Sequence, residues 1–146
     1  MTREFRVLSL NVSDCTGVQK HPVPRVFLRA DHGIVGDAHA GDWHRQVSLL
    51  AQEDVDSTRG RGTEIGFGDF AENVTTRGID LASLPVGARL HLGAAVLEVT
   101  QIGKECHTGC AISRTTGDCV MPRRGVFARV IVGGEVDRDS RCYYDL

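Results

Sequence analysis

Glycine residues interrupt this chain at short intervals, and the segments between them are rich in residues that favour β-strands. Seventeen glycines are spread over 146 residues, so tight turns are available throughout. Segments such as FRVLSLNV alternate apolar and polar side chains, as a half-buried strand does. We predict strands at about 5–12, 24–29, 45–50, 70–76, 88–92, 95–102 and 125–134. The pattern predicts a mainly β fold, a closed or nearly closed β-barrel with one to three short helices.

One segment, LAQEDVDSTRGRG, breaks this alternation. Its acidic residues come early, its arginines come late, and glycine ends it, which predicts a short helix at about 51–60. A tight turn at Gly93 and Ala94 is expected to join two of the strands. The length is that of one ordinary domain, and neither a linker nor a repeat is visible. We therefore expect a single domain over residues 1–146.

Composition excludes several classes of partner. The formal net charge is −2 and aromatic residues make up 5% of the chain, so neither a nucleic-acid partner nor a membrane partner is expected. The first residues are too short an apolar run for a signal peptide, and nowhere do 18 apolar residues follow one another. We expect the chain to work in the reducing cytoplasm, where cysteines serve as metal ligands, nucleophiles or buried side chains more often than as disulfides.

Three of the five cysteines fall in the segment KECHTGCAISRTTGDC, at positions 106, 110 and 119. A structural zinc site usually shows two close Cys pairs, and here Cys142 or His44 would have to complete the set. A reactive thiol at Cys106 is the alternative, because it follows a predicted strand beside cations that favour the thiolate. Cys110 and Cys119 are either small buried side chains or a pair that protects that thiol.

Three further segments carry candidate chemistry. In GIVGDAHAGDWHRQVSLL, His39, His44 and Arg45 indicate either a solvated loop or a site for an anion or a metal. The basic group Arg123, Arg124 and Arg129 indicates a phosphate or carboxylate partner, or a solvated strand edge. Glu72 and Asn73 are unusual inside a strand, so they either point to solvent or serve as hydrogen-bonding groups of a site.

The segments NVSDCTGVQKHPV, GIVGDAHAGDWHRQVSLL, GDFAENVTTRGIDLASLPVGARLHLGAAVLEVTQIGKEC and GVFARVIVGG together resemble the MOSC family, in family order. This family is named for the C-terminal domain of molybdenum cofactor sulfurases, and the likeness is to its small stand-alone bacterial members. The resemblance implies a β-rich barrel that handles sulfur and the molybdenum cofactor (molybdopterin). It places the family's invariant cysteine at Cys106, as a molybdenum ligand or as the carrier of a persulfide. The residues that it places in the cofactor pocket are Lys20, His39, His44, Arg45, Asn73 and Arg129.

If the chain has catalytic activity, the resemblance implies sulfur transfer or the reduction of N-oxygenated compounds at molybdenum. Reduction needs an external electron donor, and sulfur transfer needs a sulfur donor. The expected partners are the cofactor or its biosynthesis proteins. The sequence carries no aminotransferase-like segment, so no pyridoxal phosphate site is expected in this chain. Two other functions stay open from the sequence: a carrier that delivers cofactor without turnover, and a structural domain stabilised by zinc.

Overall fold

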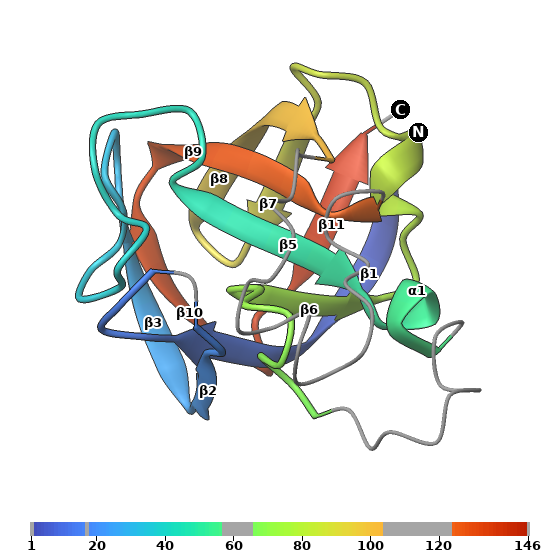
Figure 1. The fold of residues 1–146 in the computed structure, drawn as a ribbon. Coiled ribbons are helices and arrows are strands. Elements are labelled where there is room, and N and C mark those ends of the chain that lie inside the picture. The colour runs from blue at the N-terminus through green and yellow to red at the C-terminus, as the bar shows by residue number, and fades with distance from the viewer. Residues whose placement is uncertain (1, 17, 57–65, 104–123, 146) are drawn as a thin grey trace.

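A computed structural model describes residues 2–16, 18–56, 66–103 and 124–145, and its centre is a closed barrel of seven strands (Figure 1). The barrel strands are β1 Thr2–Val12, β5 Val47–Ala51, β6 Val74–Arg77, β7 Arg89–Leu92, β8 Ala95–Ile102, β9 Val126–Val132 and β11 Cys142–Asp145. They follow the spatial order β11-β7-β8-β9-β5-β6-β1, and β11 pairs with β1 to close the ring. The predicted fold class is therefore confirmed.

Closure depends on the two ends of the described chain. Thr2 lies opposite Asp145, and Phe5 lies opposite Cys142. The other barrel pairs are antiparallel except β5 with β6, where Leu49 is in register with Val74. A closed ring leaves no barrel strand with a fully exposed edge, which protects the sheet from pairing with other chains.

A second, smaller sheet and short helices complete the described part. Strands β10 Gly134–Asp137, β3 Arg25–Arg29 and β4 Gly33–Ile34 form this sheet, while β2 His21–Val23 pairs with the end of β1. Helix α1 Gln52–Asp56 follows β5, and a single 3-10 turn, η2, covers Leu81–Ser83. In this part of the chain no helix is long and apolar enough to cross a membrane.

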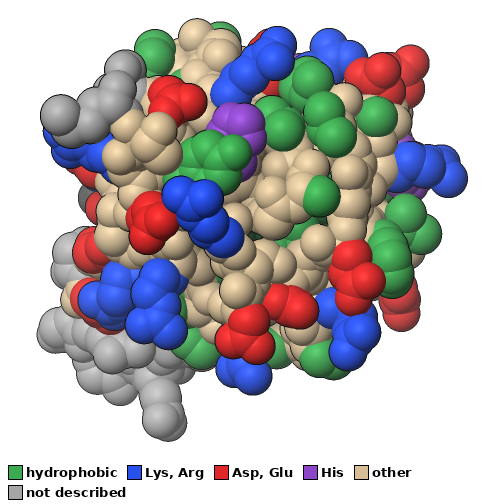
Figure 2. Space-filling model, turned by 180° about the vertical axis from the view of Figure 1, so that it is seen from behind, with side chains coloured by type: hydrophobic (Ala, Val, Ile, Leu, Met, Phe, Trp, Pro, Cys, Tyr) green, Lys and Arg blue, Asp and Glu red, His purple; other side chains and the backbone are tan. Residues whose placement is uncertain are grey.

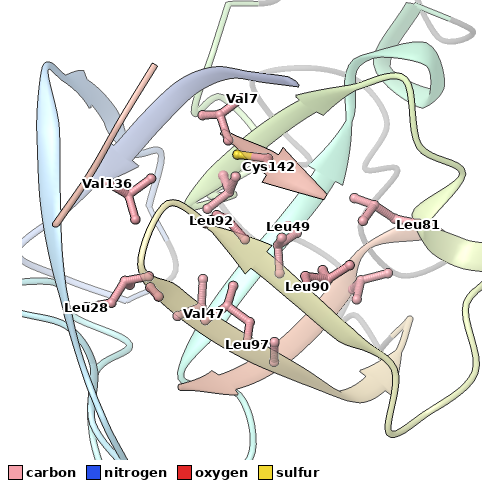
Figure 3. Packing of buried hydrophobic residues seen from close by; sticks show 14 of the residues in the cluster. Val7, Leu28, Val47, Leu49, Leu81, Leu90, Leu92, Leu97, Val136 and Cys142 are labelled. Atoms are coloured by element: carbon pink, nitrogen blue, oxygen red, sulfur yellow. The ribbon is translucent and has the colours of Figure 1, made fainter. Parts of the chain in front are cut away.

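The core fills the barrel and extends under the second sheet. Alternate side chains of β8, namely Ala95, Leu97 and Val99, are fully buried. Figure 3 shows Leu97 packing with residues of β5 and β7, and Leu28 and Val136 of the second sheet join the same cluster. Truncating a buried leucine of this kind to alanine costs about 2–5 kcal/mol.

Cys142 is part of this core rather than part of a metal site. Its side chain is 1% exposed and points among the apolar residues labelled in Figure 3. Burial raises the pKa of its thiol to about 11. The group therefore stays a protonated thiol at neutral pH, and a buried thiol of this kind is unreactive.

The predicted elements differ from the observed ones at a few points. The predicted strand 70–76 begins only at Val74, because Ala71 has a φ of 65° and turns the chain. The predicted strand 125–134 corresponds to β9 and reaches only the first residue of β10. The two strands separate at Gly133, where an added Cβ would lie 2.6 Å from the carbonyl oxygen of Leu28. The predicted helix 51–60 is observed over Gln52–Asp56, and its later residues lie outside the described ranges. Strands β2, β4 and β11 were not predicted.

Candidate functional site

Lys20 forms a buried ion pair. Its Nζ donates to Asp37 Oδ1 at 2.8 Å and to Ser13 Oγ at 3.0 Å, and neither charged side chain is accessible to solvent. Burial lowers the pKa of Lys20. Two loops that are distant in sequence, after β1 and after β4, are thereby held together. In this structure Lys20 fixes backbone and does not offer its ammonium to a ligand.

Asp37 is the other centre of this contact. Its carboxylate also accepts from the backbone N–H of Ser13 and of His39, each at 3.1 Å, and its Oδ2 lies 3.9 Å from His39 Nδ1. Burial acts to raise the pKa of Asp37, but the ammonium of Lys20 and the two N–H groups outweigh it and lower the pKa overall. Asp37 therefore stays ionised and orients the backbone at His39.

Asn73 is a buried side chain that links β1 and β5. Its Nδ2 donates to the carbonyl of Asn11 at 3.1 Å, and its Oδ1 accepts from the backbone N–H of Ser48 at 2.9 Å. The neighbouring Glu72 accepts from Thr75 Oγ1 at 2.8 Å. Both Glu72 and Asn73 precede β6, so the prediction that they lie inside a strand is wrong. Neither side chain points to solvent.

A second group gathers on the connection from β4 to β5, which arches at the left of Figure 1. The Arg45 guanidinium lies 4.9 Å from the centre of the Trp43 ring and 5.6 Å from that of Phe127 on β9. The imidazoles of His39 and His44 lie 6.5 and 6.0 Å from the Trp43 ring. We call Trp43, His39, His44 and Arg45 the loop cluster.

Arg45 has cation–π contacts and no carboxylate partner among the residues that the structure describes. Its Nε–H group is buried and has no hydrogen-bond acceptor in that part of the chain. A half-buried guanidinium normally finds an oxygen acceptor, because an unsatisfied buried donor is costly. The donor set of Arg45 is therefore suited to an external anion.

The other predicted basic residues have internal partners. Arg129 pairs with Asp31, although its buried Nε has no acceptor in the described ranges. Arg124 bridges Asp54 at 3.0 Å and Asp80 at 2.6 Å. Two carboxylates of this chain thus supply the partner that the sequence predicts for Arg124.

His44 links the loop cluster to the end of β8. Its Nε2 lies 2.8 Å from Gln101 Oε1, and Thr100 donates its hydroxyl to the His44 carbonyl. Gly103 then follows, and its N–H donates to Gly125 at 2.6 Å. Cys106, Cys110, Cys119 and Arg123 lie outside the residues that the structure describes, so the predicted thiol site stays a prediction.

Of the predicted site residues in the described ranges, Lys20 belongs to the buried contact around Asp37, and His39, His44 and Arg45 belong to the loop cluster. Asn73 and Arg129 bond to other residues. His39 links the two groups, because Asp37 accepts from its backbone N–H. Among the described ranges, three or more side chains suited to a metal ion do not come together anywhere. Sequence reasoning missed Trp43 and Phe127 as partners of Arg45. The signal available was that Trp43 is the chain's one tryptophan and lies within the histidine segment.

Other surface features lie away from both groups. A hollow of about 480 Å³ runs along β1, and its walls contain Arg6, Val7, Leu8, Pro24, Arg25, Asp137, Arg138 and Asp139. It includes none of the predicted site residues. On the face shown in Figure 2, basic and acidic side chains are interspersed rather than gathered into one patch. Surface ion pairs such as Arg141–Glu4 and Arg25–Glu135 show this local balance.

Comparisons with known proteins agree with this fold. No curated protein matches the chain significantly. The crystal structure of the YuaD protein from Bacillus subtilis has a TM-score of 0.80 at 17% identity, over 99% of this chain and 97% of that one. YiiM from Geobacillus stearothermophilus has a TM-score of 0.74 at 19% identity, over 97% and 75%. YiiM from Escherichia coli has a TM-score of 0.72 at 17% identity, over 99% and 70%. The MOSC domain profile matches residues 36–142, and the chain therefore belongs to the MOSC domain family.

Proposed function

We propose that this protein binds the molybdenum cofactor through the loop cluster, with Cys106 as thiolate ligand or as persulfide carrier. Family membership supports the choice of cofactor. The observation that carries the proposal is Arg45, a half-buried guanidinium without an anionic partner in the described part of the chain. Such a donor fits the phosphate of a pterin cofactor, because charge-assisted hydrogen bonds to phosphate are among the strongest in proteins.

The position of Cys106 along the chain agrees with this proposal. Strand β8 carries Gln101, which contacts His44, and Cys106 comes only three residues after Gly103. We therefore propose that Cys106 acts beside the loop cluster, which contacts the end of β8 through His44 and Gln101.

Each residue then has a distinct proposed role. Arg45 binds the anionic end of the cofactor, while His39 and His44 donate hydrogen bonds or protons beside it. Arg129 adds positive charge, part of which is neutralised by its ion pair with Asp31. Lys20 and Asn73 position the loops from within the fold, because both are buried and bonded internally. When bound, the cofactor supplies a metal centre for oxygen-atom or sulfur chemistry.

The test is mass and metal analysis of protein purified from a host that makes the cofactor. We expect molybdopterin, or a mass increase of about 32 Da for a persulfide sulfur. Cys106→Ser should abolish either signal, whereas Cys15→Ser should not, since the family likeness assigns the ligand or persulfide to Cys106 and not to the exposed free thiol of Cys15. Cys142→Ser is a second control for the buried thiol. Stoichiometric zinc with unfolding on chelation, or equal effects of the three substitutions, would overturn the proposal.

Turnover separates an enzyme from a carrier once cofactor has been found. Reduction of an N-hydroxylated compound in the presence of a supplied reductase would support a catalytic role. Sulfur transfer from a persulfide to an acceptor would support the sulfur-handling role. Tight cofactor retention without either reaction would identify a carrier. The reductase, sulfur-handling and carrier roles would all use the same proposed cofactor site, so the cysteine variants above test each of them.

A further inference from the structure

Strand β1 has a gap in its pairing along one edge. One edge of β1 pairs with β6, and the opposite edge pairs with β11 from Thr2 to Phe5 and with β2 from Leu10 to Val12. The residues between these last two ladders, 6–9, have no strand partner on that edge in the described part of the chain. They span roughly 13 Å, at about 3.3 Å per residue. The ring of strands is closed, but β1 keeps a short open edge.

A β-bulge lies within the same stretch. The register of β1 with β6 shifts between Val7 and Ser9, so Leu8 lies opposite no residue of β6. Leu8 therefore has no strand partner on either side among the residues that the structure describes. A bulge interrupts the ladder of hydrogen bonds and leaves the extra residue unpaired. Unpaired backbone groups at an edge are a template onto which another extended chain can add.

Two adjoining hollows lie along this open edge. The hollow of about 480 Å³ along β1 and a second one of about 300 Å³ share Leu8, Pro24 and Arg138 in their walls. The second hollow also contains Val23 and Phe67, and the Phe67 side chain is 40% exposed. We call the two hollows together the β1 groove. An apolar surface thus accompanies the unpaired backbone.

Arginines outnumber carboxylates in the first hollow, whose charged residues are Arg6, Arg25, Arg138, Asp137 and Asp139. Arg25 already forms an ion pair with Glu135 on β10. Arg6 and Arg138 are exposed and have no carboxylate partner within the described ranges. Asp137, in contrast, accepts from the backbone N–H of Asp139 at 2.9 Å. Two guanidiniums that lack an anion favour a ligand with a carboxylate.

We infer that the β1 groove binds a short extended segment of a partner protein, which adds to the open edge of β1. The segment carries an acidic residue for Arg6 and Arg138 and an apolar residue for Leu8. These two residues stand two positions apart, because side chains at that spacing share one face of a strand. Main-chain hydrogen bonds give such binding its affinity, and the hollows give it specificity. None of these residues belongs to the loop cluster, so the inference is independent of the proposed cofactor site.

The probe for this groove is the fluorescein-labelled peptide TLTETLT with blocked ends. Its sequence is the same in both directions, so either strand orientation presents a glutamate two positions from a leucine. Binding is measured by fluorescence polarisation at low ionic strength, where charge contacts are least screened. We expect TLTETLT to bind about tenfold more tightly than TLTKTLT, because lysine replaces attraction by repulsion.

Arginine variants locate the site. Arg6→Gln and Arg138→Gln should each weaken the binding of TLTETLT about threefold, as expected for exposed charge pairs. Both side chains are exposed, so the substitutions leave the core intact. Arg29→Gln is the matched control, because Arg29 is an exposed arginine of the second sheet that does not line the groove. This variant should bind the peptide as the wild type does.

Backbone measurements test the addition of a strand. The amides of residues 6–9 that face the gap should exchange with solvent about tenfold more slowly when TLTETLT is bound. Successive backbone groups of a strand point to opposite edges. Methylation of the peptide nitrogens of the leucines and glutamate, or alternatively of the inner threonines, should therefore abolish binding in one case and leave it in the other.

Several outcomes would overturn the inference. An absence of peptide binding would identify Pro24 and the arginines as protection of the open edge against pairing. Equal weakening by Arg29→Gln would mean that the peptide responds only to the overall charge. Displacement by inorganic phosphate at the concentration of the peptide would indicate a site for small anions. Binding of both methylated peptides, without slower exchange at residues 6–9, would exclude an added strand.

Discussion

At the scale of single residues, Glu72 is a carboxyl group whose charge state is changed by the fold. It is 1% exposed, and burial raises its pKa above the ordinary value of 4.5, although Thr75 and a backbone N–H donate to it. Asp37 behaves oppositely, because Lys20 and two N–H groups lower its pKa below 3.8. The two carboxyl groups therefore affect the free energy of unfolding in opposite ways as pH changes. Asp37 acts as pH falls below about 3.8, and Glu72 acts as pH rises above about 4.5.

We predict that the contribution of Glu72 to stability is complete below about pH 4.5 and is lost as pH rises through its raised pKa. Between those values the unfolded chain releases the proton and the folded chain keeps it, so the free energy of unfolding falls with pH. One group gives a slope of at most about 1.4 kcal/mol per pH unit. Urea unfolding of wild type and Glu72→Gln between pH 4.5 and 8 measures it. Equal slopes for the two proteins would contradict the prediction.

At the scale of elements, the loop after β1 is held by a close approach of Gly68. Its carbonyl accepts from the Lys20 N–H at 2.9 Å, and a Cβ added at Gly68 would lie 2.3 Å from the Lys20 carbonyl oxygen. The residue also has a φ of 83°. The backbone that carries the Lys20–Asp37 pair therefore depends on the absence of a side chain at this position.

We predict that Gly68→Ala destabilises the protein by at least about 2 kcal/mol more than Gly36→Ala. Gly36 is a matched control, because its φ is 88° but open space surrounds it, so it tests the left-handed conformation without the clash. Gly36→Ala alone should cost about 1 kcal/mol. Denaturant midpoints at constant slope give both values. Equal losses for the two variants would show that the Lys20 loop moves aside freely.

Long alternating strands are predictable from this sequence, and short ones are not. The predicted range 95–102 agrees with β8, whose buried and half-buried side chains alternate over its first six residues. Strand β4 has two residues and β11 has four, too few for a pattern. The range 70–76 ends in the strand-forming residues Val74, Thr75 and Thr76, and the backbone turn at Ala71 delays the strand to Val74. Local propensity carries no information on that turn.

The site was predictable only in its residue types. In the sequence, Asp37 lies in a segment that fits a solvated loop, and the family likeness places Lys20 in the cofactor pocket. They become a buried pair because two loops 17 residues apart meet. Arg45 and Phe127 are even more distant along the chain, and β5 and β9 bring them together by pairing. Which cation remains without an anion thus depends on tertiary neighbours, which no spacing in the sequence encodes.

At the scale of the whole molecule, the fold depends on a contact between its two terminal strands. The hydrogen bond from Thr2 to Asp145 spans 143 positions of the sequence, and the β1–β11 ladder continues to Phe5 and Cys142. The loop cluster is carried by the connection between β4 and β5, which packs on the barrel at β8 and β9. A rigid ring that presents functional side chains on its connections is a common arrangement, because loops vary freely on such a scaffold.

Such a long-range closure should slow folding, because loop entropy is lost before the contacts of β1 with β11 form. A circular permutant that joins the ends through a few glycines and opens the chain between Arg138 and Asp139 makes these strands a local hairpin. The closure entropy then falls by up to about 3 kcal/mol, by the logarithmic dependence on loop length. We expect refolding at least tenfold faster than in the wild type, measured by stopped-flow fluorescence of Trp43.

A second permutant with the same joined ends, opened beside the exposed Val86, separates the effect of joining from that of cutting. Both permutants have the local β11–β1 hairpin, so both should refold faster by a similar factor. If only one of the two permutants refolds faster, the faster refolding is caused by the position at which that chain was opened and not by joining the ends. Unchanged rates in both would mean that closure follows the rate-limiting step, with the barrel nucleating instead at the local pair of β7 and β8, where Leu92 lies opposite Ala95.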